Sequence, residues 1–347
     1  MLMSEKQPNT PMDQNPIAQF NLNITGNNPD FQLRPGVETD LKPAEELIPS
    51  PELQRELREP MLITSDKPPY LSFEVLHLNR ESEGPPLIMT LAWSINTQHE
   101  GTNYEAEQTA IQTGRPMWII NNPNTSALGD RLSKEQREEL KHGSGFEALA
   151  NPLLSALKTQ GINRASFEGT SMGARIAASL AANASRYGID IDSLILIDPP
   201  GMEDRSLARL TKDFVGENPN LMRYNELSND PRYTENDTIV DTIKFFASLA
   251  RQGFDTNFLS FPRAMAKGNL VDDMMMALGS QERLRITLIY GTESRISNPE
   301  AIMKLYKQQL SQVMRQRIRL KLLPGETHAL GQGQAKKIAA HINEALN

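Results

Sequence analysis

Residues 165–183 read ASFEGTSMGARIAASLAAN, the most informative segment of the sequence. It contains the pattern G-x-S-x-G, with Ser171 between Gly169 and Gly173. A short strand-like segment precedes the pattern and an alanine-rich, helix-favouring segment follows it. In that context the serine is expected on a sharp strand-to-helix turn, where the two glycines let strand and helix approach closely. Such a turn exposes the hydroxyl above the sheet at the positive end of a helix. We therefore predict that Ser171 is a nucleophile.

The rest of the chain alternates between strand-like and helix-like segments. Apolar runs typical of strands occur at residues 71–78, 86–93, 116–120, 193–197, 285–290 and 318–323. Helix-like segments cover residues 133–141, 146–159, 174–187, 299–314 and 334–346. This alternation predicts an α/β fold, with a mainly parallel, doubly wound sheet and helices on both faces.

Two segments depart from the alternation. Residues 1–60 contain nine of the 23 prolines and few clustered apolar residues, so we predict a polar amino-terminal arm. The arm is either extended and disordered, or ordered only along a partner. Residues 202–284 separate two strands by far more than a crossover needs, and they look mostly helical. We predict that they form a helical lid inserted in a core of residues 61–201 and 285–347.

Composition limits the classes of function. No run approaches the ~20 apolar residues of a membrane span, and residues 1–20 lack the apolar centre of a signal peptide. The chain has no cysteine, which excludes disulfides and thiolate chemistry, and we expect a cytoplasmic protein. The net charge of −7 argues against nucleic-acid binding. We predict neither a cofactor nor a metal site.

With these features the sequence resembles the α/β-hydrolase family, from about residue 61 to the last residue and outside residues 202–284. In that family the nucleophile is followed by a lid, an acid and then a histidine after the last strand. Here Ser171 precedes the predicted lid, residues 291–294 (GTES) and residues 324–328 (PGETH). The resemblance implies a serine hydrolase in which His328 is the general base.

The acid remains open between two residues. The family usually places an aspartate three residues after the glycine that ends the seventh strand, and Ser294 occupies that position. Glu293, one residue earlier, is one candidate. The other is Asp198 at the end of the sixth strand, which is the alternative location in the family. Either carboxylate would orient the imidazole and stabilise its charged form.

The oxyanion hole is expected to use two backbone N–H groups, from Met172 and from the loop after Trp93. Ser94 is the predicted second donor, although the family often has His-Gly in this loop. His99, on the same loop side, is a further candidate for lining the site.

Glu168 stands at an ordinarily apolar position of the strand before the turn. Burying an unpaired carboxylate is costly, so a cation is expected beside it. Arg164 and Arg175 are the predicted partners.

Two functions are consistent with these residues. The first is a serine hydrolase acting on an ester, thioester or related acyl compound, with an apolar portion of the substrate under the lid. The second is a catalytically inactive binding or structural assembly protein on the same fold. In that case residues 1–60 would bind a protein partner or a second copy. Two departures from the family pattern, the serine at position 294 and the missing His-Gly, favour the second function. The fold alone does not establish activity.

Overall fold

The computed structural model describes residues 49–221 and 260–347, except residues 94, 124, 126–127, 143–144, 298, 309–311 and 329–333. The chain divides into two units, Met1–Asp40 and Leu41–Asn347, and every described residue belongs to the second. Residues 1–48 of the predicted arm, residues 222–259 of the predicted lid and Ser94 lie outside the described residues.

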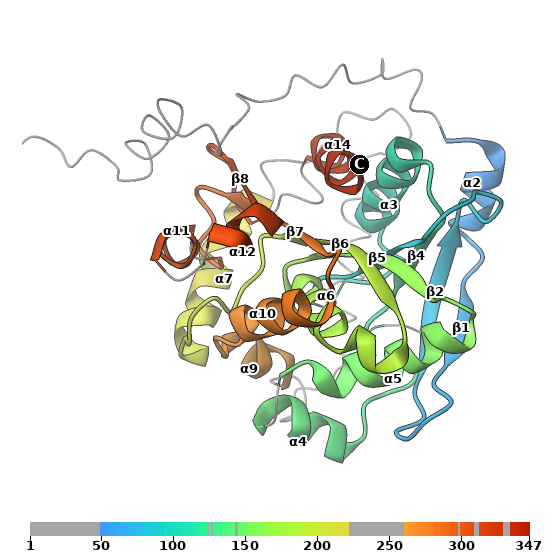
Figure 1. Ribbon diagram of the computed structural model, residues 1–347, viewed down its shortest axis with the longest axis horizontal. Coiled ribbons are helices and arrows are strands. Elements are labelled where there is room, and N and C mark those ends of the chain that lie inside the picture. The colour runs from blue at the N-terminus through green and yellow to red at the C-terminus, as the bar shows by residue number, and fades with distance from the viewer. Residues whose placement is uncertain are drawn as a thin grey trace, which may run out of the picture. The chain divides into compact units, whose positions relative to one another are not determined.

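Within the described residues, eight strands form one sheet in the order β1-β2-β4-β3-β5-β6-β7-β8 (Figure 1). They are β1 (Met61–Thr64), β2 (Ser72–Leu78), β3 (Leu87–Thr90), β4 (Met117–Ile120), β5 (Arg164–Thr170), β6 (Asp190–Ile197), β7 (Arg285–Gly291) and β8 (Ile318–Leu323). Strand β2 is antiparallel to β1 and to β4, whereas the other pairs are parallel. The mainly parallel sheet predicted from the apolar runs is therefore confirmed.

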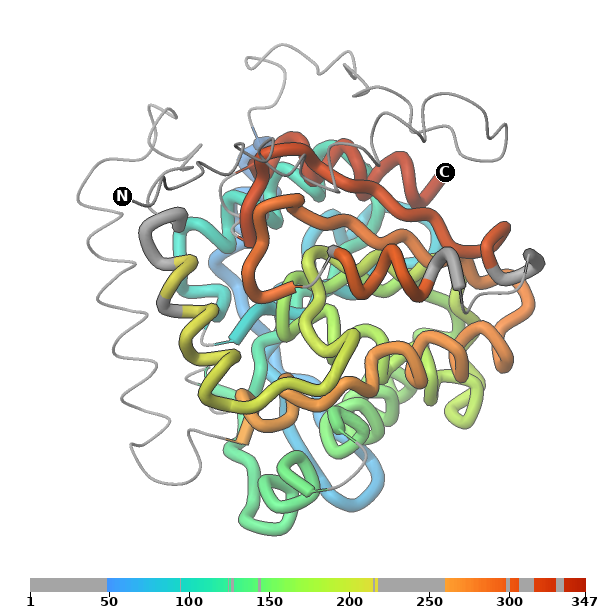
Figure 2. Tube along the Cα trace, turned by 90° about the vertical axis from the view of Figure 1, so that its left-hand side faces the viewer, coloured from blue at the N-terminus to red at the C-terminus, as the bar shows by residue number. Residues whose placement is uncertain are grey.

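Helices cover both faces of this sheet. On one face lie α3 (Glu100–Thr113) and α14 (Ala335–Leu346), packed against each other. On the other lie α5 (Glu147–Thr159), α6 (Met172–Asn183) and α10 (Leu270–Ser280), with α6 in the middle. The view turned by 90° places α14 and α6 on opposite sides of the strands in the same way (Figure 2). Parallel strands require such crossovers, which is why both faces are buried.

The other helices of the described residues do not belong to these two layers. They are α2 (Pro51–Glu56), α4 (Lys134–His142), the 3-10 turn η2 (Ala184–Tyr187), α7 (Leu207–Leu221), α9 (Ser260–Ala266), α11 (Pro299–Gln308) and α12 (Gln312–Arg317).

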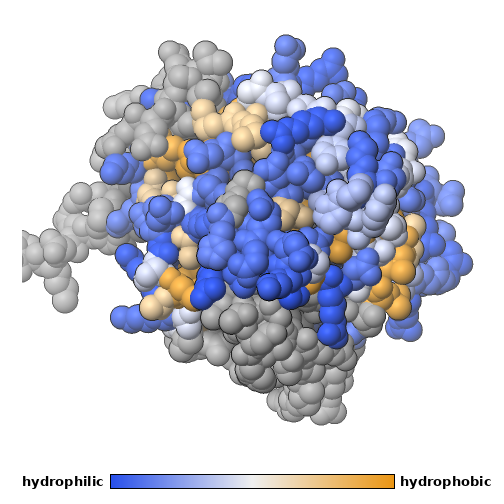
Figure 3. Space-filling view, turned by 90° about the horizontal axis from the view of Figure 1, so that it is seen from below, coloured by the Kyte–Doolittle hydropathy of each residue, from blue (hydrophilic) through white to orange (hydrophobic). Residues whose placement is uncertain are grey.

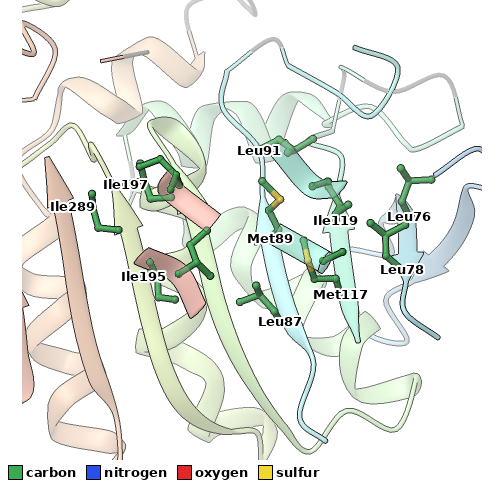
Figure 4. Close-up of a cluster of buried hydrophobic side chains, with 14 of the residues drawn as sticks. Leu76, Leu78, Leu87, Met89, Leu91, Met117, Ile119, Ile195, Ile197 and Ile289 are labelled. Atoms are coloured by element: carbon green, nitrogen blue, oxygen red, sulfur yellow. The ribbon is translucent and has the colours of Figure 1, made fainter. Parts of the chain in front are cut away.

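A cluster of apolar side chains fills the space between the sheet and the α3–α14 layer (Figure 4). The strands contribute Leu76, Leu78, Leu87, Met89, Met117, Ile119, Ile195, Ile197 and Ile289. Helices α3 and α14 contribute alanines and isoleucines such as Ala106 and Ile338. Alternate strand residues face this layer, so the neighbours of these residues point toward α6.

Residues 51–56, which the sequence analysis assigned to the arm, form helix α2 of the folded unit. Helix α2 starts after Ser50, whose side chain accepts a hydrogen bond from the Leu53 N–H at 3.1 Å. Leu53 is buried in the apolar cluster. The buried Glu56 carboxylate accepts the backbone N–H of Asn79 at 2.7 Å. Residues 49–60 therefore belong to the folded unit, which they contact through Leu53 and Glu56.

Helix α10 lies within residues 202–284, which the sequence analysis assigned to a lid. Helix α10 packs against α6 in the layer that covers the sheet, and it leads directly into β7. It is thus the crossover helix between the parallel strands β6 and β7. Helices α7 and α9, which precede it, contact each other. Of the described residues, only these two helices and their connections remain candidates for a lid.

On the face seen from below, the described surface is mostly hydrophilic and its apolar residues are scattered in small patches (Figure 3). The large apolar side chains exposed among the described residues are Leu62, Tyr70, Leu128 and Met276. Within the described part of the chain, every helix is too short or too polar to cross a bilayer.

Candidate active site

Ser171 lies between the end of β5 and the start of α6, in a backbone conformation that few residues adopt. Its φ is 56° and its ψ is −120°. A side chain on Gly169 would place its Cβ 2.4 Å from the backbone of Gly173, and one on Gly173 would come 2.0 Å from the Thr90 carbonyl oxygen. The turn at residues 169–173, called the serine turn below, therefore requires both glycines.

Neighbouring strands hold the serine turn. The Ser171 N–H donates to the carbonyl oxygen of Ile197, at the end of β6, at 2.8 Å. The Thr90 hydroxyl, at the end of β3, donates to the carbonyl oxygen of Gly173 at 2.7 Å. The turn is thus fixed at the carboxyl ends of the central strands, where open α/β sheets bind ligands.

His328 reaches the Ser171 hydroxyl from the loop that follows β8. Its Nε2 lies 2.8 Å from Ser171 Oγ, and both residues are nearly buried. Gly291 makes room for this loop, since a Cβ there would lie 2.4 Å from the carbonyl oxygen of Glu326. The Glu293 N–H also donates to that oxygen at 2.9 Å, so the loops after β7 and β8 run together.

Asp198 lies directly after β6, with a φ of 46°, and is fully buried. Its Oδ2 contacts His328 Nδ1 and accepts the Ser294 hydroxyl at 2.5 Å. Its Oδ1 accepts the Gly291 N–H at 3.3 Å, and its carbonyl oxygen accepts the Ser297 hydroxyl at 2.7 Å. Of the two candidate acids, Asp198 is the one that touches His328, whereas the side chain of Glu293 is exposed.

These contacts fix the tautomer of His328. A carboxylate only accepts hydrogen bonds, so the proton is on Nδ1 when the imidazole is neutral. Nε2 is then left to accept the proton of the Ser171 hydroxyl. The arrangement can deprotonate Ser171 and stabilise the resulting imidazolium through Asp198.

The two predicted oxyanion donors differ in what the structure describes. Met172 is the first residue of α6, so its N–H has no carbonyl acceptor within the helix. Ser94 lies outside the described residues. Beside it, the Trp93 ring meets the edge of Phe214 of α7, with ring centres 5.7 Å apart. His99 is buried, and its Nδ1 lies 2.9 Å from the side-chain oxygen of Asn96.

Neither arginine predicted to neutralise Glu168 does so. Arg164 forms a two-pronged contact with Asp192, at 2.8 to 3.0 Å. Arg175 projects from α6, which covers the opposite face of the sheet, and lies 3.7 Å from Asp273 of α10. The Glu168 side chain faces α3, where it lies 3.4 Å from the Thr170 hydroxyl. The sequence placed these residues close together but could not tell which face each side chain occupies.

Sequence reasoning also missed the part played by Ser294, which it had treated only as a missing acid. Its hydroxyl donates to Asp198 and accepts the Ser297 N–H at 3.2 Å. The role of Ser294 could have been predicted, because the resembled family usually has its acid at this position, close to the histidine.

Helix α7 lies at the same end of the sheet as Ser171. Phe214 meets Trp93, three residues after β3, and the Glu217 carboxylate accepts the backbone N–H of Arg295, four residues after β7. The Arg205 guanidinium, just before α7, donates to the carbonyl oxygen of Ile296 at 2.7 Å. Among the described residues, no group of three or more His, Cys, Asp or Glu side chains could hold a metal ion.

Comparison with solved structures identifies the fold. A bromoperoxidase from Bacillus anthracis aligns with a TM-score of 0.56 and 12% identity, over 83% of this chain and 99% of that chain. A carboxylesterase of Nitrososphaera gargenis gives 0.54 and 16%, over 81% and 96%. An enol-lactonase from Burkholderia xenovorans gives 0.52 and 16%, over 79% and 96%. No protein-family model and no curated protein matches the sequence. The chain has the α/β-hydrolase fold, as the resemblance implied.

Proposed function

From the α/β-hydrolase fold and the contacts of Ser171, we propose that the chain is a serine hydrolase acting on an ester, thioester or related acyl compound. The observation that carries the proposal is the unbroken path from Asp198 through His328 to Ser171, with 2.8 Å between Nε2 and Oγ. A serine hydroxyl is a weak nucleophile unless a base within hydrogen-bond reach removes its proton. An imidazole held by a buried carboxylate meets that need.

In the proposed reaction, Ser171 Oγ attacks the acyl carbon while its proton passes to His328 Nε2. The negative oxygen that forms is stabilised by the Met172 N–H and the amino terminus of α6. When the tetrahedral intermediate collapses, the leaving alcohol or thiol takes the proton from Nε2. A water molecule then attacks the acyl-serine, giving a proton to Nε2. His328 returns that proton to Ser171 Oγ as the carboxylic acid departs.

The comparisons support the proposal only through the fold. The carboxylesterase and the enol-lactonase are named for ester and lactone substrates, whereas the bromoperoxidase is named for other chemistry. One fold hosts many reactions, so the contacts of Ser171, His328 and Asp198 support the hydrolase function more strongly than the fold does.

The proposed substrate has an apolar portion. Trp93 and Phe214 bring an aromatic surface to the end of the sheet that carries Ser171, and both rings are partly exposed. Aromatic surface of this kind favours an apolar group over a charged one. We propose that α7 forms part of the lid, in contact with this portion of the substrate.

Hydrolysis of short-chain aryl esters tests the function. Ser171→Ala and His328→Ala should each lower kcat by about a thousandfold or more, because each removes a group that acts only with the other. Ser179→Ala, at a buried serine on the same helix, is the matched control and should keep wild-type kcat. Equal activity of all four proteins would overturn the hydrolase proposal and favour the binding or assembly role.

A further inference from the structure

Two buried carboxyl groups lie next to the serine turn and have no part in the proposed reaction. Glu105 projects from α3 and Glu168 from β5, and both are almost completely shielded from solvent. The Thr170 hydroxyl oxygen lies 3.4 Å from Glu105 Oε1 and 3.4 Å from Glu168 Oε1. Thr170 is the residue before Ser171, so both carboxyl groups meet the turn at a single atom.

The Thr170 hydroxyl cannot satisfy two ionised carboxylates at once. A threonine hydroxyl has one proton, so it can donate to only one of the two carboxyl groups. If both carboxyl groups were ionised, the one that does not accept the Thr170 proton would face the hydroxyl oxygen with no hydrogen between the two oxygen atoms. The remaining oxygen of Glu168, Oε2, is buried with no hydrogen-bond partner. One added proton resolves the conflict, because a protonated carboxyl group can donate to Thr170 Oγ1 while that hydroxyl donates to the other carboxylate.

The surroundings of the pair favour a bound proton. Burial raises the pKa of Glu105 to about 7. Burial, and then the charge of Glu105, raises the pKa of Glu168 well above the ordinary glutamate range. The strands that flank Glu168 place Met89 and Ile195 beside it, and both are apolar. Desolvation penalises the ionised form of both groups, and a like charge nearby adds to the penalty.

Several titratable groups of the surrounding helices contact residues outside the pair, whereas the Tyr104 hydroxyl of α3, next to Glu105 in the chain, is buried. On α3, His99 contacts Asn96 and the Glu107 carboxylate accepts a hydrogen bond from Gln108. On α14, Lys337 forms an ion pair with Glu326, and His341 faces Lys321 and Glu344. Helix α14 presents the apolar Ile338 and Ile342 to the buried cluster.

We propose that Glu105 and Glu168 form a proton-sharing carboxyl pair that positions the serine turn through Thr170. The effect of the pair on the reaction rests on the hydrolase function proposed above. The existence of the shared proton does not depend on that function. Ser171 has a positive φ of 56°, a conformation that persists only where the surroundings enforce it. The pair joins α3 to the last residue of β5 and so contributes to that constraint.

Stability as a function of pH measures the shared proton directly. An unfolded glutamate loses its proton near its ordinary pKa, whereas the buried pair keeps its proton to higher pH. The pair therefore contributes stability that is complete below the ordinary glutamate pKa and is lost as pH rises toward and beyond 7. Each proton released on unfolding lowers the folding equilibrium constant by up to about tenfold per pH unit.

Denaturant unfolding of wild type and of Glu168→Gln between pH 5 and pH 8 is the first arm. Glutamine keeps the shape and a donor for Thr170 but cannot ionise. The ratio of the folding constants, variant over wild type, should rise at least about tenfold over this range. Glu74→Gln is the matched control at a buried carboxylate that accepts hydrogen bonds from Asn121 and Leu128. A ratio for Glu168→Gln that stays constant, or one that Glu74→Gln reproduces, would overturn the proposal.

The rate at which a fluorophosphonate reacts with Ser171 is the second arm. Thr170→Ser keeps the bridging hydroxyl and should react within about threefold of wild type, whereas Thr170→Val should react at least about tenfold more slowly. Equal rates for the two variants would overturn the positioning role. If wild type does not react at all while the folding constants behave as expected, the hydrolase function falls and the proton-sharing pair stands.

Discussion

The candidate site depends on a few residues in uncommon backbone conformations at the ends of adjacent strands. Ser171 after β5 and Asp198 after β6 have φ values of 56° and 46°. The backbone N–H of Asp198 donates to the carbonyl oxygen of Ile289 on β7 at 2.7 Å, which holds the residue in this conformation. Such conformations cost energy and persist where neighbouring groups enforce them. Their position beside His328 is the strongest residue-scale sign of function.

Exchanging the acid tests the role of Asp198. Asp198→Asn keeps the shape of the side chain but presents an amide to His328 Nδ1. The amide no longer fixes the tautomer in which Nε2 is free to accept a proton. We expect kcat for an aryl ester to fall by about a thousandfold or more. Glu293→Gln alters an exposed side chain and should keep kcat within about threefold. Equal small losses from the two changes would show that the acid has been misassigned.

At the scale of elements, helix α14 is fixed to β8 by a group of polar side chains. His341 of α14 faces Lys321 of β8, with 3.2 Å between Nζ and Nδ1, and the Lys321 ammonium forms an ion pair with Glu344 at 2.5 Å. Burial, followed by the charge of Lys321, lowers the pKa of His341 to about 4. The helix therefore packs with a neutral histidine. Its position matters because α14 follows the loop that carries His328.

The pKa of His341 predicts an acid-sensitive stability. Unfolded histidine takes up a proton near pH 6.5 while folded His341 stays neutral to about pH 4, so stability is lost as pH falls through this window. Between pH 7 and pH 4, wild type should lose about 3 kcal/mol of unfolding free energy relative to His341→Gln. His142→Gln, on the exposed end of α4, is the control for a histidine at the surface. If wild type lost the same unfolding free energy relative to His142→Gln as relative to His341→Gln, the acid sensitivity could not be assigned to His341.

At the scale of the whole molecule, the features that could be predicted from sequence are those that close backbone contacts determine. The glycines at 169 and 173 are required by close backbone contacts, so the pattern located the serine turn and hence the order of strands and helices. The partner of Glu168 depended on which face of the sheet each side chain occupies, and spacing alone could not decide this. The choice between Asp198 and Glu293 depended on the path of two loops, which only the folded chain defines.

Composition could not separate helices α2 and α10 from the predicted arm and lid for a related reason. Composition averages over many residues, whereas Leu53 and Glu56 attach α2 to the fold through single buried contacts. Helix α10 looked like lid in sequence because an apolar helix face is the same whether it covers a sheet or a substrate.

The place of α2 in the folded unit gives a test by deletion. A chain lacking residues 1–48 should keep the wild-type Tm within about 2 °C, since the buried contacts of α2 remain. Removing residues 1–60 should lower it clearly, because Leu53 leaves the apolar cluster and the Asn79 N–H loses its acceptor. Leu53→Ala alone should cost about 2–4 kcal/mol of unfolding free energy. Equal Tm values for both deletions would return the boundary to residue 60.

Covalent labelling measures whether His328 activates Ser171 as a nucleophile. A fluorophosphonate reacts with an activated serine because the adduct resembles the tetrahedral intermediate, and the result depends little on the shape of the true substrate. Intact-mass and peptide measurements should find one adduct per chain, on Ser171, in wild type and in the Ser179→Ala control. Ser171→Ala and His328→Ala should remain unlabelled while keeping the wild-type Tm within a few degrees. Folded wild-type protein that gains no adduct, or gains one at another residue, would show that His328 does not activate Ser171.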